Sequence, residues 1–567
     1  MCNNCNISYR LPKHVPVVFH NLSNFDAHLI IPELGRDNGS IDVTATSMEK
    51  FISFSKKVGN MKLRFIDSYR FLSSSLRQLA DSLEREDLIE TRKSVPEDKI
   101  DLVAGKSFFP YSYIDGLEKF NDRSLPKKEH FYNRLTDSHI SDEDYEFCQR
   151  VWRELEMRDI GEFSDFYMKL DTTLLCDVME RFRAATMESF GLDPMHYLTL
   201  PALSFSAMLK YTKCKLQLLT DMDMIQMLES GVRGGMVQLI ERYVEANNKY
   251  LPDYNPEKES VYLAFLDSSN LYGWAQGQVL GYGDFKWVTP DSIGDIMKLD
   301  KNGEKGYILE CDFSYENNEL HDHHYDFPLL PITEYPPNGK YKKLMNTLTN
   351  KTKYVAHYWT VQQALEMGLK ITKIHRVLEF SQSKWLEPYI AYNTAMRERA
   401  TTKFDQDFRK LLINSIFGKF LENKRKHKNV KLITDPNKLA KLVGKPHFKT
   451  SMIINENLVA VSMGKTKITL DRPTYLGFSI LDISKTLMYD FHYNKMVKHF
   501  GRDRINICYQ DTDSFLYKIL TDDLYSELAT FEYKHEFDFS DYPIDHIAYD
   551  GGVNKKTRVN LKMNSSL

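Results

Sequence analysis

The sequence predicts an α+β fold spread over several domains, and three observations support this fold class. The chain has 567 residues, more than one hydrophobic core usually serves, so about two to four domains are expected. Apolar residues alternate with polar ones along residues 505–517, on both sides of a polar turn, which is typical of a β-hairpin. Residues 163–190, 353–368 and 385–420 instead have the pattern of long helices.

The composition is that of an ordinary globular protein, with 42% hydrophobic and 27% charged residues and a net charge of −3. No run approaches the roughly 20 apolar residues that a membrane span needs, and the polar N-terminus carries no secretory signal. The seven cysteines are odd in number and scattered, which suits reduced thiols. We therefore expect a soluble intracellular protein without a membrane partner, in either the nucleus or the cytoplasm.

The hairpin at residues 507–517 carries two carboxylates, Asp511 and Asp513, two positions apart. On an extended chain they would leave the same face and repel each other unless a cation lay between them. Mg²⁺ suits such hard oxygen ligands, because it takes one or two carboxylates and completes its shell with waters and substrate phosphates. The alternative is a solvated acidic turn, since Asp and Ser favour turns.

A third carboxylate decides between these two interpretations. The apolar strand expected at residues 261–267 ends at Asp267, and a turn then presents Tyr272. A carboxylate at the end of a buried strand suits a shared metal site. A tyrosine five residues later would stack on a nucleotide sugar and exclude a 2′-hydroxyl, which favours deoxynucleotides.

The helix within residues 385–420 has a face suited to a nucleotide. Lys410, Asn414 and Phe417 are at positions i, i+4 and i+7, and Arg397 adds a positive charge upstream. Cations directed at a triphosphate, with an aromatic ring under the base, are what a nucleotide-delivering helix requires. The alternative is an amphipathic surface helix with a glycine break at Gly418.

Two further segments are candidates for binding nucleic acid. In residues 231–236, Arg233 offers a phosphate partner, and Gly234 and Gly235 allow close backbone approach, although an ordinary glycine turn has the same pattern. Residues 419–445 form the strongest basic cluster, which is either a solvated face or a surface for phosphates. Its first cations after the helix are Lys424, Arg425 and Lys426.

Two pairs of polar residues stand out nearer the N-terminus. Asn21 and Asp26 follow an apolar strand within residues 15–30, where Asn and Asp also serve strand-to-helix turns as caps. Tyr167 and Asp171 lie at i and i+4 of a helix and therefore share a face. Such a pair is also common where a helix is partly buried and partly solvated.

Three motifs in chain order, DSSNLY (267–272), KLLINSIFG (410–418) and YQDTDS (509–514), resemble the A, B and C motifs of family B DNA polymerases. Their details are similar to the protein-primed branch, especially the polymerases of Maverick/Polinton elements and related viruses. HNLSNFD (20–26) and Tyr167-x3-Asp171 are similar to the second and third exonuclease motifs, and VRGG (232–235) to the linker motif. The resemblance implies a palm and fingers with an RNase H-like exonuclease domain.

The resemblance also implies a role for each matching residue. Asp267 and Asp513 would bind two Mg²⁺ ions with support from Asp511, and Tyr272 would be the sugar gate. Lys410 would hold the triphosphate, and Asn414 and Phe417 would shape the nascent base pair. The proofreading site would comprise Asn21, Asp26, Tyr167 and Asp171. The implied partners are template and primer DNA, dNTPs and a terminal priming protein.

The chain departs from the family pattern at both ends. The first exonuclease motif, an acidic DxE pair, should precede HNLSNFD by several tens of residues, yet only 19 residues precede His20. This argues against proofreading. After residues 554–556 the chain diverges from the family's lysine motif and thumb, so a truncated polymerase is expected. The expected domains are an incomplete exonuclease-like domain (1–190), linker and first part of the palm (191–289), an insertion (290–350), fingers (351–418), a second, basic insertion (419–470), and the rest of the palm with the thumb largely missing (471–567).

The expected function is template-directed DNA synthesis by a DNA-directed DNA polymerase, in protein-primed replication of a virus-like or transposable element. In this reaction a primer 3′-hydroxyl, or a hydroxyl of the priming protein, attacks the α-phosphate of a dNTP and releases pyrophosphate. Two alternatives remain. The chain is either a catalytically impaired remnant that binds nucleic acid, or a 3′–5′ exonuclease, against which the absent DxE pair counts.

Overall fold

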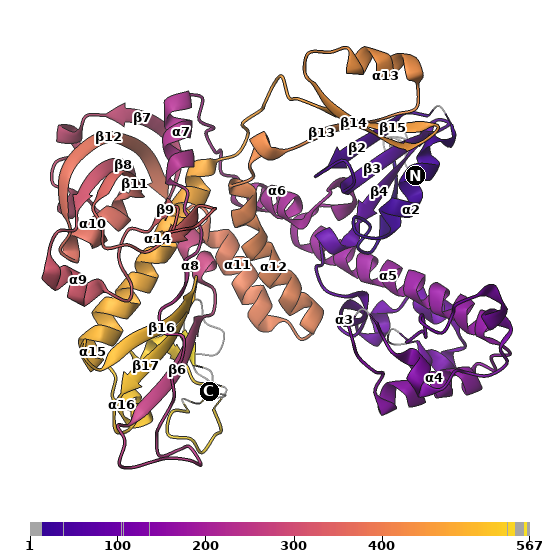
Figure 1. The fold of residues 1–567 in the computed structure, drawn as a ribbon, viewed down its shortest axis with the longest axis horizontal. Helices are drawn as coiled ribbons and strands as arrows, with labels where there is room; N and C mark the ends of the chain where they lie inside the picture. Colours follow the sequence, from indigo (N-terminus) through magenta and orange to yellow (C-terminus); the bar gives the residue numbers. More distant parts are fainter. Residues whose placement is uncertain are drawn as a thin grey trace, which may run out of the picture. The chain divides into compact units, whose positions relative to one another are not determined.

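The computed structural model divides the chain into two compact units, each built from segments far apart in the sequence (Figure 1). The first unit comprises Met1–Ala207, Arg399–Leu411 and Asn423–Leu470, and the second comprises Met208–Glu398, Leu412–Glu422 and Asp471–Leu567. The structure describes residues 14–37, 39–103, 105, 107–134, 136–540, 542–549, 551 and 561–563.

The first unit begins with a four-stranded sheet of order β1-β4-β3-β2. Strand β1 (Val15–Phe19) runs parallel to β4 (Met61–Asp67), and β3 (Phe51–Val58) is antiparallel to both β4 and β2 (Ile41–Ala45). Helix α2 (Asp26–Glu33) follows β1 directly and buries Ala27 and Ile31. The strand and following turn expected within residues 15–30 are therefore present.

The basic segment after residue 423 folds onto this first unit. Its strands β13 (Asn429–Ile433), β15 (Leu458–Met463) and β14 (Phe448–Asn455) form an antiparallel sheet with helix α13 (Pro436–Val443) on one face. Alternate residues enter different cores, as strand geometry requires. Val430, Leu432, Leu458 and Ala460 join a core with Leu22, Ile31 and Phe54, whereas Val461 and Met463 pack against Leu442 of α13. The expected basic insertion at 419–470 thus shares a core with the N-terminal sheet.

Helices complete the first unit. Helix α5 (Ile160–Phe190) begins at its cap Asp159 and ends at Gly191, whose φ of 60° is the left-handed cap that glycine favours. The long helix expected at 163–190 is confirmed. The other helices are α3 (Leu76–Ala80), α4 (Asp142–Glu154) and α6 (Leu200–Thr212), joined by short 3₁₀ turns. The domain boundary expected at 190/191 falls at the end of α5, whereas the two units meet within α6.

The second unit contains a six-stranded sheet of order β18-β19-β6-β17-β16-β5. The predicted hairpin is confirmed as β16 (Ile505–Asp511) and β17 (Ser514–Leu520), but its alternation breaks at a bulge between Ile507 and Tyr509, where Cys508 is also buried. The remaining strands are β5 (Val237–Leu239), β6 (Val261–Ser268), β18 (Phe537–Asp538) and β19 (Leu561–Met563).

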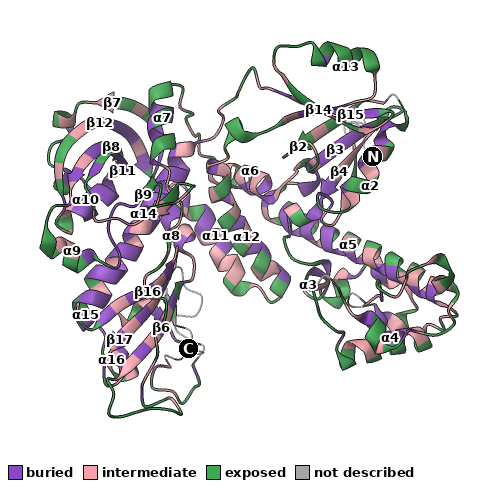
Figure 2. Ribbon diagram, viewed as in Figure 1, coloured by how far each residue is buried: buried purple, intermediate pink, exposed green. Residues whose placement is uncertain are grey.

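The helix expected after the Asp471–Pro473 turn is α14 (Thr474–Asp490). Most of its residues are buried (Figure 2). It continues into a π-helical segment, Phe491–Val497, in which Phe491 lies against Phe515 and His492 stacks on Tyr517. Smaller helices in this unit are α7 (Met222–Gly231), α8 (Leu271–Gln276), α15 (Lys498–Phe500) and α16 (Leu524–Ala529).

A second sheet of this unit has the order β11-β8-β12-β7. Strand β8 (Lys305–Ser314) pairs with both β11 (Lys351–His357) and β12 (Lys370–Ser383), so the boundary expected at 350/351 divides one sheet. Residues 353–357 were expected in a helix but continue β11, because their pairing with β8 outweighs the local pattern. The sheet also includes β7 (Leu280–Val288); the neighbouring elements are α9 (Asn318–His324), β9 (Ile332–Glu334), β10 (Lys343–Met345) and α10 (Tyr358–Glu366).

The long helix expected at 385–420 is two helices, α11 (Glu387–Arg399) and α12 (Lys403–Phe420). The break has a local cause, since Thr402 Oγ1 accepts the backbone N–H of Asp405 at 3.1 Å and so caps α12. None of the helices in the described part of the chain combines the length and apolar character that crossing a membrane requires.

Candidate active site

The turn between β16 and β17 carries the two predicted carboxylates, but not on an extended strand. Thr512 has a φ of 55°, and the Asp513 N–H donates to the Asp511 carbonyl at 2.6 Å. The expectation that strand alternation would put both carboxylates on one face is therefore wrong, because the chain reverses at Thr512. Asp511 instead accepts hydrogen bonds from Thr512 Oγ1 at 3.0 Å and from the Tyr509 hydroxyl at 3.4 Å.

The third predicted carboxylate lies at the same end of the sheet. Asp267, near the end of β6, is the register partner of Ser514 in β17, and Ser514 is also the partner of Asp511. The Ser268 N–H donates to the Asp513 carbonyl at 2.8 Å and ties β6 to the turn. Two segments about 240 residues apart in sequence thus meet where the motifs predicted.

Tyr272 joins this end of the sheet to helix α12. The Tyr272 ring stacks on Phe417 with centroids 4.6 Å apart and planes at 13°. Burial, followed by the charges of Asp513 and Asp511, raises the pKa of Tyr272 to about 12, so its hydroxyl stays protonated at neutral pH. Residues of all three motifs therefore surround one site in the second unit. Tyr272 was expected in a turn and instead opens the short helix α8, which Asn270 caps.

Helix α12 presents the predicted face to solvent. Lys410 and Asn414 are exposed and Phe417 is half-buried, whereas Ile413 and Ile416 face the interior. Lys410 belongs to the part of α12 in the first unit, and Asn414 and Phe417 to the part in the second. Arg397 is half-buried near the end of α11.

The glycine pair, Gly234 and Gly235, lies beside the turn between β16 and β17. The Met236 carbonyl accepts the Thr512 N–H at 2.6 Å, and β5 then pairs with β16 from Val237 opposite Asp511. Arg233, predicted as a phosphate partner, donates to the carbonyls of Gly231 and Val355, each at 2.9 Å. Its guanidinium also lies 3.7 Å from the centre of the Tyr354 ring. In the structure, Arg233 therefore anchors this segment to the protein.

Comparison with known proteins agrees with this arrangement. Residues 7–496 match the family model described as DNA polymerase type B, organellar and viral. The chain belongs to this family. The match includes Asp267, Tyr272 and helix α12 and ends before the hairpin of Asp511 and Asp513, so the sheet pairing is what adds the hairpin to the site. The protein is thus a DNA-directed DNA polymerase of type B.

Among solved structures, the polymerase resembles Phi29 DNA polymerase in an orthorhombic crystal form. The two share 15% sequence identity and a TM-score of 0.50, over 90% of this chain and 72% of the other. Phi29 DNA polymerase complexed with primer-template DNA and incoming nucleotides also matches, at 15% identity, with a TM-score of 0.49 and coverage of 89% and 72%. The likeness concerns the fold. No curated protein matches the chain.

The donor set of the polymerase site fits Mg²⁺ held jointly by protein and substrate. Asp267 is exposed, and Asp511 and Asp513 are half-buried, so none of the three carboxylates is enclosed in the core. In the described part of the chain, no group of three or more His, Cys, Asp or Glu residues forms a ready metal cage. Mg²⁺ commonly takes only one or two carboxylates and completes its shell with waters and phosphates.

The exonuclease-like residues lie in the first unit. Asn21 has a φ of 63°, and its Oδ1 accepts a hydrogen bond from Asn24 at 2.8 Å. Asp26 begins α2, whose cap Phe25 makes no side-chain bond. Sequence reasoning missed Asp67, which is 2% exposed and accepts the Ser23 N–H at 3.1 Å, so that it holds this turn against β4. The signal was a carboxylate ending an apolar strand, as at Asp267.

Tyr167 and Asp171 lie one turn apart on α5, as predicted. Tyr167 is buried and accepts a hydrogen bond from the Tyr111 hydroxyl at 2.9 Å. Burial, then the Asp171 charge, raises the pKa of Tyr167 well above its usual value. The structure therefore has a partly buried helix face at Tyr167 and Asp171, as the alternative interpretation of this pair expected.

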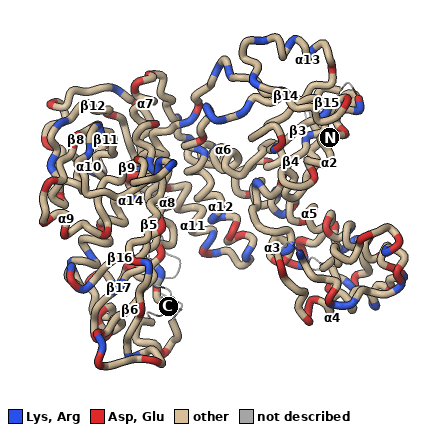
Figure 3. The backbone as a smooth tube through the Cα atoms, in the orientation of Figure 1, with Lys and Arg blue, Asp and Glu red and all other residues tan. Residues whose placement is uncertain are grey.

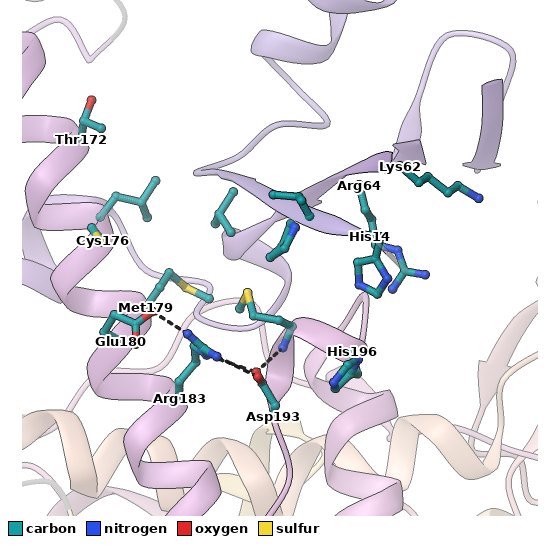
Figure 4. A pocket seen from close by; sticks show the side chains of 15 residues that line it. His14, Lys62, Arg64, Thr172, Cys176, Met179, Glu180, Arg183, Asp193 and His196 are labelled. Carbon is teal, nitrogen blue, oxygen red and sulfur yellow. Dashed lines mark hydrogen bonds and ion pairs between the residues drawn. The ribbon is translucent and has the colours of Figure 1, made fainter. Parts of the chain in front are cut away.

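A cavity of about 1080 Å³ lies in the first unit between β1 and α5 (Figure 4). Arg183 donates to Asp193 at 2.8 Å and to Glu180 at 2.7 Å along its wall. The described lining residues include none of the four exonuclease-like candidates. The cavity is therefore separate from the residues that the motifs singled out.

Lys and Arg recur along the basic segment, as the blue stretches of its backbone in Figure 3 show, and most of them are exposed. Arg425 and Lys426 are exposed in a short turn that Asn423 caps, and Lys424 is half-buried, its carbonyl accepting a hydrogen bond from Lys465 at 2.7 Å. The other exposed lysines between positions 428 and 445 are Lys428, Lys431, Lys438, Lys441 and Lys445.

Sequence reasoning also missed Lys562. Strand β19 pairs antiparallel with β6 and places Lys562 opposite Asp267. The alternation of Leu561 and Met563 with Lys562 was the available signal, but the segment is too short for a pattern to be decisive. A cation therefore neighbours the candidate catalytic carboxylate on the strand next to it.

Proposed function

We propose that this polymerase extends a primer 3′-hydroxyl, or a hydroxyl of a priming protein, with dNTPs on a DNA template. The observation that carries the proposal is the convergence of Asp267, Tyr272, Phe417 and the Asp511–Asp513 turn at one end of the six-stranded sheet. The family, described as organellar and viral, supports replication of a virus-like or transposable element as the context.

Asp267 and Asp513 hold two Mg²⁺ ions in this proposal, with Asp511 in support. When bound, the metals activate the attacking hydroxyl and stabilise the oxygens of the leaving pyrophosphate. The protein holds the carboxylates in place through the pairing of β6, β17 and β16. Asp511 is further oriented by the hydroxyls of Thr512 and Tyr509.

Tyr272 acts as the sugar gate. The stack with Phe417 fixes the plane of its ring, and a ring held in this way would exclude a ribose 2′-hydroxyl. Phe417 stands where many relatives have tyrosine, and the stack requires only the ring. Lys410 and Arg397 neutralise the triphosphate and Asn414 contacts the nascent base pair, since charge developing on phosphates is stabilised by fixed cations.

DNA lies along two surfaces in this proposal. The exposed Gly234, beside Gly235 and Arg233, allows the template backbone to approach the site closely. Lys424, Arg425 and Lys426 contact phosphates in the first unit, so their removal should weaken DNA binding and flatten its salt dependence. Asn21, Asp26, Tyr167 and Asp171 are assigned to an exonuclease-like site.

Primer extension on a primed single strand with Mg²⁺ and dNTPs tests the proposal, with Asp513→Asn as the inactive variant. Asp522→Asn is the matched control, because Asp522 is an exposed carboxylate just beyond the other end of β17. We expect extension by the native protein and the control only. Extension that survives Asp513→Asn would refute the assignment of the site. DNA binding without extension by the native protein would indicate a nucleic-acid-binding remnant instead.

A further inference from the structure

Thr512, between the two carboxylates, has an unfavourable backbone conformation. Its φ of 55° lies in the left-handed region, where a β-branched residue is an outlier. Such residues persist only where their surroundings hold them, and they gather at functional sites. The Thr512 hydroxyl donates to Asp511 at 3.0 Å, so its position is coupled to a catalytic carboxylate. The contacts that hold Thr512 in this conformation therefore also fix the orientation of the neighbouring Asp511 and Asp513.

The neighbouring segment 233–237 holds Thr512 in this conformation. The Met236 carbonyl accepts the Thr512 N–H at 2.6 Å, and Val237 pairs with Asp511 in the adjacent strand. Gly235 lies directly against the Thr512 side chain. A Cβ on Gly235 would come within 2.9 Å of Thr512 Cβ and 2.6 Å of its Cγ2, and closer still to Oγ1. Any side chain at position 235 would therefore clash with Thr512 unless Thr512 moved.

The backbone of Gly235 does not itself require glycine, because its φ lies outside the left-handed region. The adjacent Gly234 differs, since a Cβ there would meet no atom within 4 Å. Two neighbouring glycines thus have different reasons for lacking a side chain. Gly234 borders open space, whereas Gly235 makes room for Thr512.

The segment is anchored and cannot easily move away from the turn. Lys485 of α14 donates to the Arg233 carbonyl at 2.9 Å, and burial lowers the pKa of Lys485 to about 8. The Arg233 guanidinium bonds the carbonyls of Gly231 and Val355. Because these anchors lie at one end and the β5–β16 pairing at the other, a clash at Gly235 is transmitted to Thr512 rather than absorbed by the segment.

We propose that Gly235 is a positioning residue for polymerisation. It provides the space in which Thr512 adopts its left-handed conformation, and thereby it directs Asp511 and Asp513. The inference rests on the proposed catalytic role of these two carboxylates. Under this proposal Gly235 serves to position Thr512 rather than to contact DNA, whereas Gly234 remains available for contact with DNA.

The test compares Gly235→Ala with the native protein, with Thr512→Gly and with the double variant that carries both substitutions. Gly235→Ala should lower kcat for primer extension about 10- to 100-fold, as expected when reacting groups are displaced by about 1 Å. The KM values for primer-template and dNTP should change little. Thr512→Gly removes all three atoms that the new Cβ would meet, so Gly235→Ala should cost almost nothing in the Thr512→Gly background.

The proposal can be tested even if Gly235→Ala alone does not fold, because kcat of the double variant is compared with kcat of Thr512→Gly. An equal loss of kcat in both backgrounds would overturn the inference. So would a Gly235→Ala variant that keeps native kcat, or one whose only defect is a raised Kd for primer-template with a reduced salt dependence. Failure of the catalytic assignment is recognised separately, because Asp513→Asn would then retain extension.

Discussion

Two turns of this polymerase carry candidate site residues, and each contains a left-handed residue that is not glycine. The turn after β1 has Asn21 at a φ of 63°, and the turn after β16 has Thr512 at 55°. Asparagine tolerates this conformation because its short side chain bonds locally, as Asn21 does with Asn24. Threonine has no such tolerance, and its conformation depends on Met236 and Gly235 of another segment.

The acidic residues of the two turns differ in the same way. Asp26 begins helix α2, where a negative charge near the N-terminus is favourable without any ligand. Asp511 and Asp513 instead lie half-buried in a turn at the end of the sheet that also carries Asp267. The left-handed residue of the first turn therefore bonds within its own turn, whereas Thr512 depends on a neighbouring segment for its conformation. In the proposed function, this second turn is the one that binds the metal ions.

The largest expected effect comes from the carboxylates. Asp267→Asn should lower the rate of primer extension by about 1000-fold or more. The substitution removes a proposed metal ligand and the negative charge that would attract the metal ions bound with the triphosphate. Asp26→Asn, the matched change in the first unit, should leave extension native. Single-turnover extension measures both. Similar losses in the two variants would mean that the turns do not differ as proposed.

The next effect concerns the aromatic residue beside the second turn. Tyr272→Ala should raise the ratio of ribonucleotide to deoxynucleotide incorporation about 10- to 100-fold, because it opens the space for a 2′-hydroxyl. Tyr272→Phe keeps the ring that stacks on Phe417 and should retain discrimination. Competition assays with rNTP and dNTP mixtures measure the ratio. An unchanged ratio for Tyr272→Ala would remove the gate assignment.

A smaller effect tests the structural role of the first turn. Asp67→Ala leaves the buried N–H of Ser23 and the partly buried N–H of Tyr69 without their acceptor. The loss at the buried Ser23 N–H should destabilise the first unit by about 1–3 kcal/mol. Thermal unfolding of the whole chain should show an earlier transition, while extension at low temperature stays native. Loss of extension without any shift in melting would instead assign Asp67 to chemistry.

The smallest effect concerns the left-handed residue itself. Asn21→Ala should cost about 1 kcal/mol of folding free energy, because alanine pays the steric cost of a positive φ, and Asn21→Gly should be nearly neutral. Denaturant unfolding measures the difference. If Asn21→Gly were as destabilising as Asn21→Ala, the side-chain bond to Asn24 rather than the backbone conformation would hold the first turn.

Local patterns predicted much of the site. The hairpin of β16 and β17, the strand that ends with Asp267 and Ser268, and helix α5 all follow from apolar spacing within one segment. Patterns failed where a distant partner decided the outcome. Residues 353–357 became a strand because β8 pairs with them, and the basic segment gained a core from the N-terminal sheet. Lys562 was missed because its strand is too short to recognise from sequence and is defined by its pairing with β6.

The sequence by itself therefore determined which residues are candidates for the chemistry of this polymerase and the type of element on which most of them lie. The tertiary structure decided how those elements meet, including Asp267 beside the hairpin turn, Tyr272 on Phe417 and Gly235 against Thr512. The physical reason is that side-chain periodicity is read over a few residues. Strand pairing, ring stacking and steric exclusion instead join residues hundreds of positions apart, and no local pattern records them.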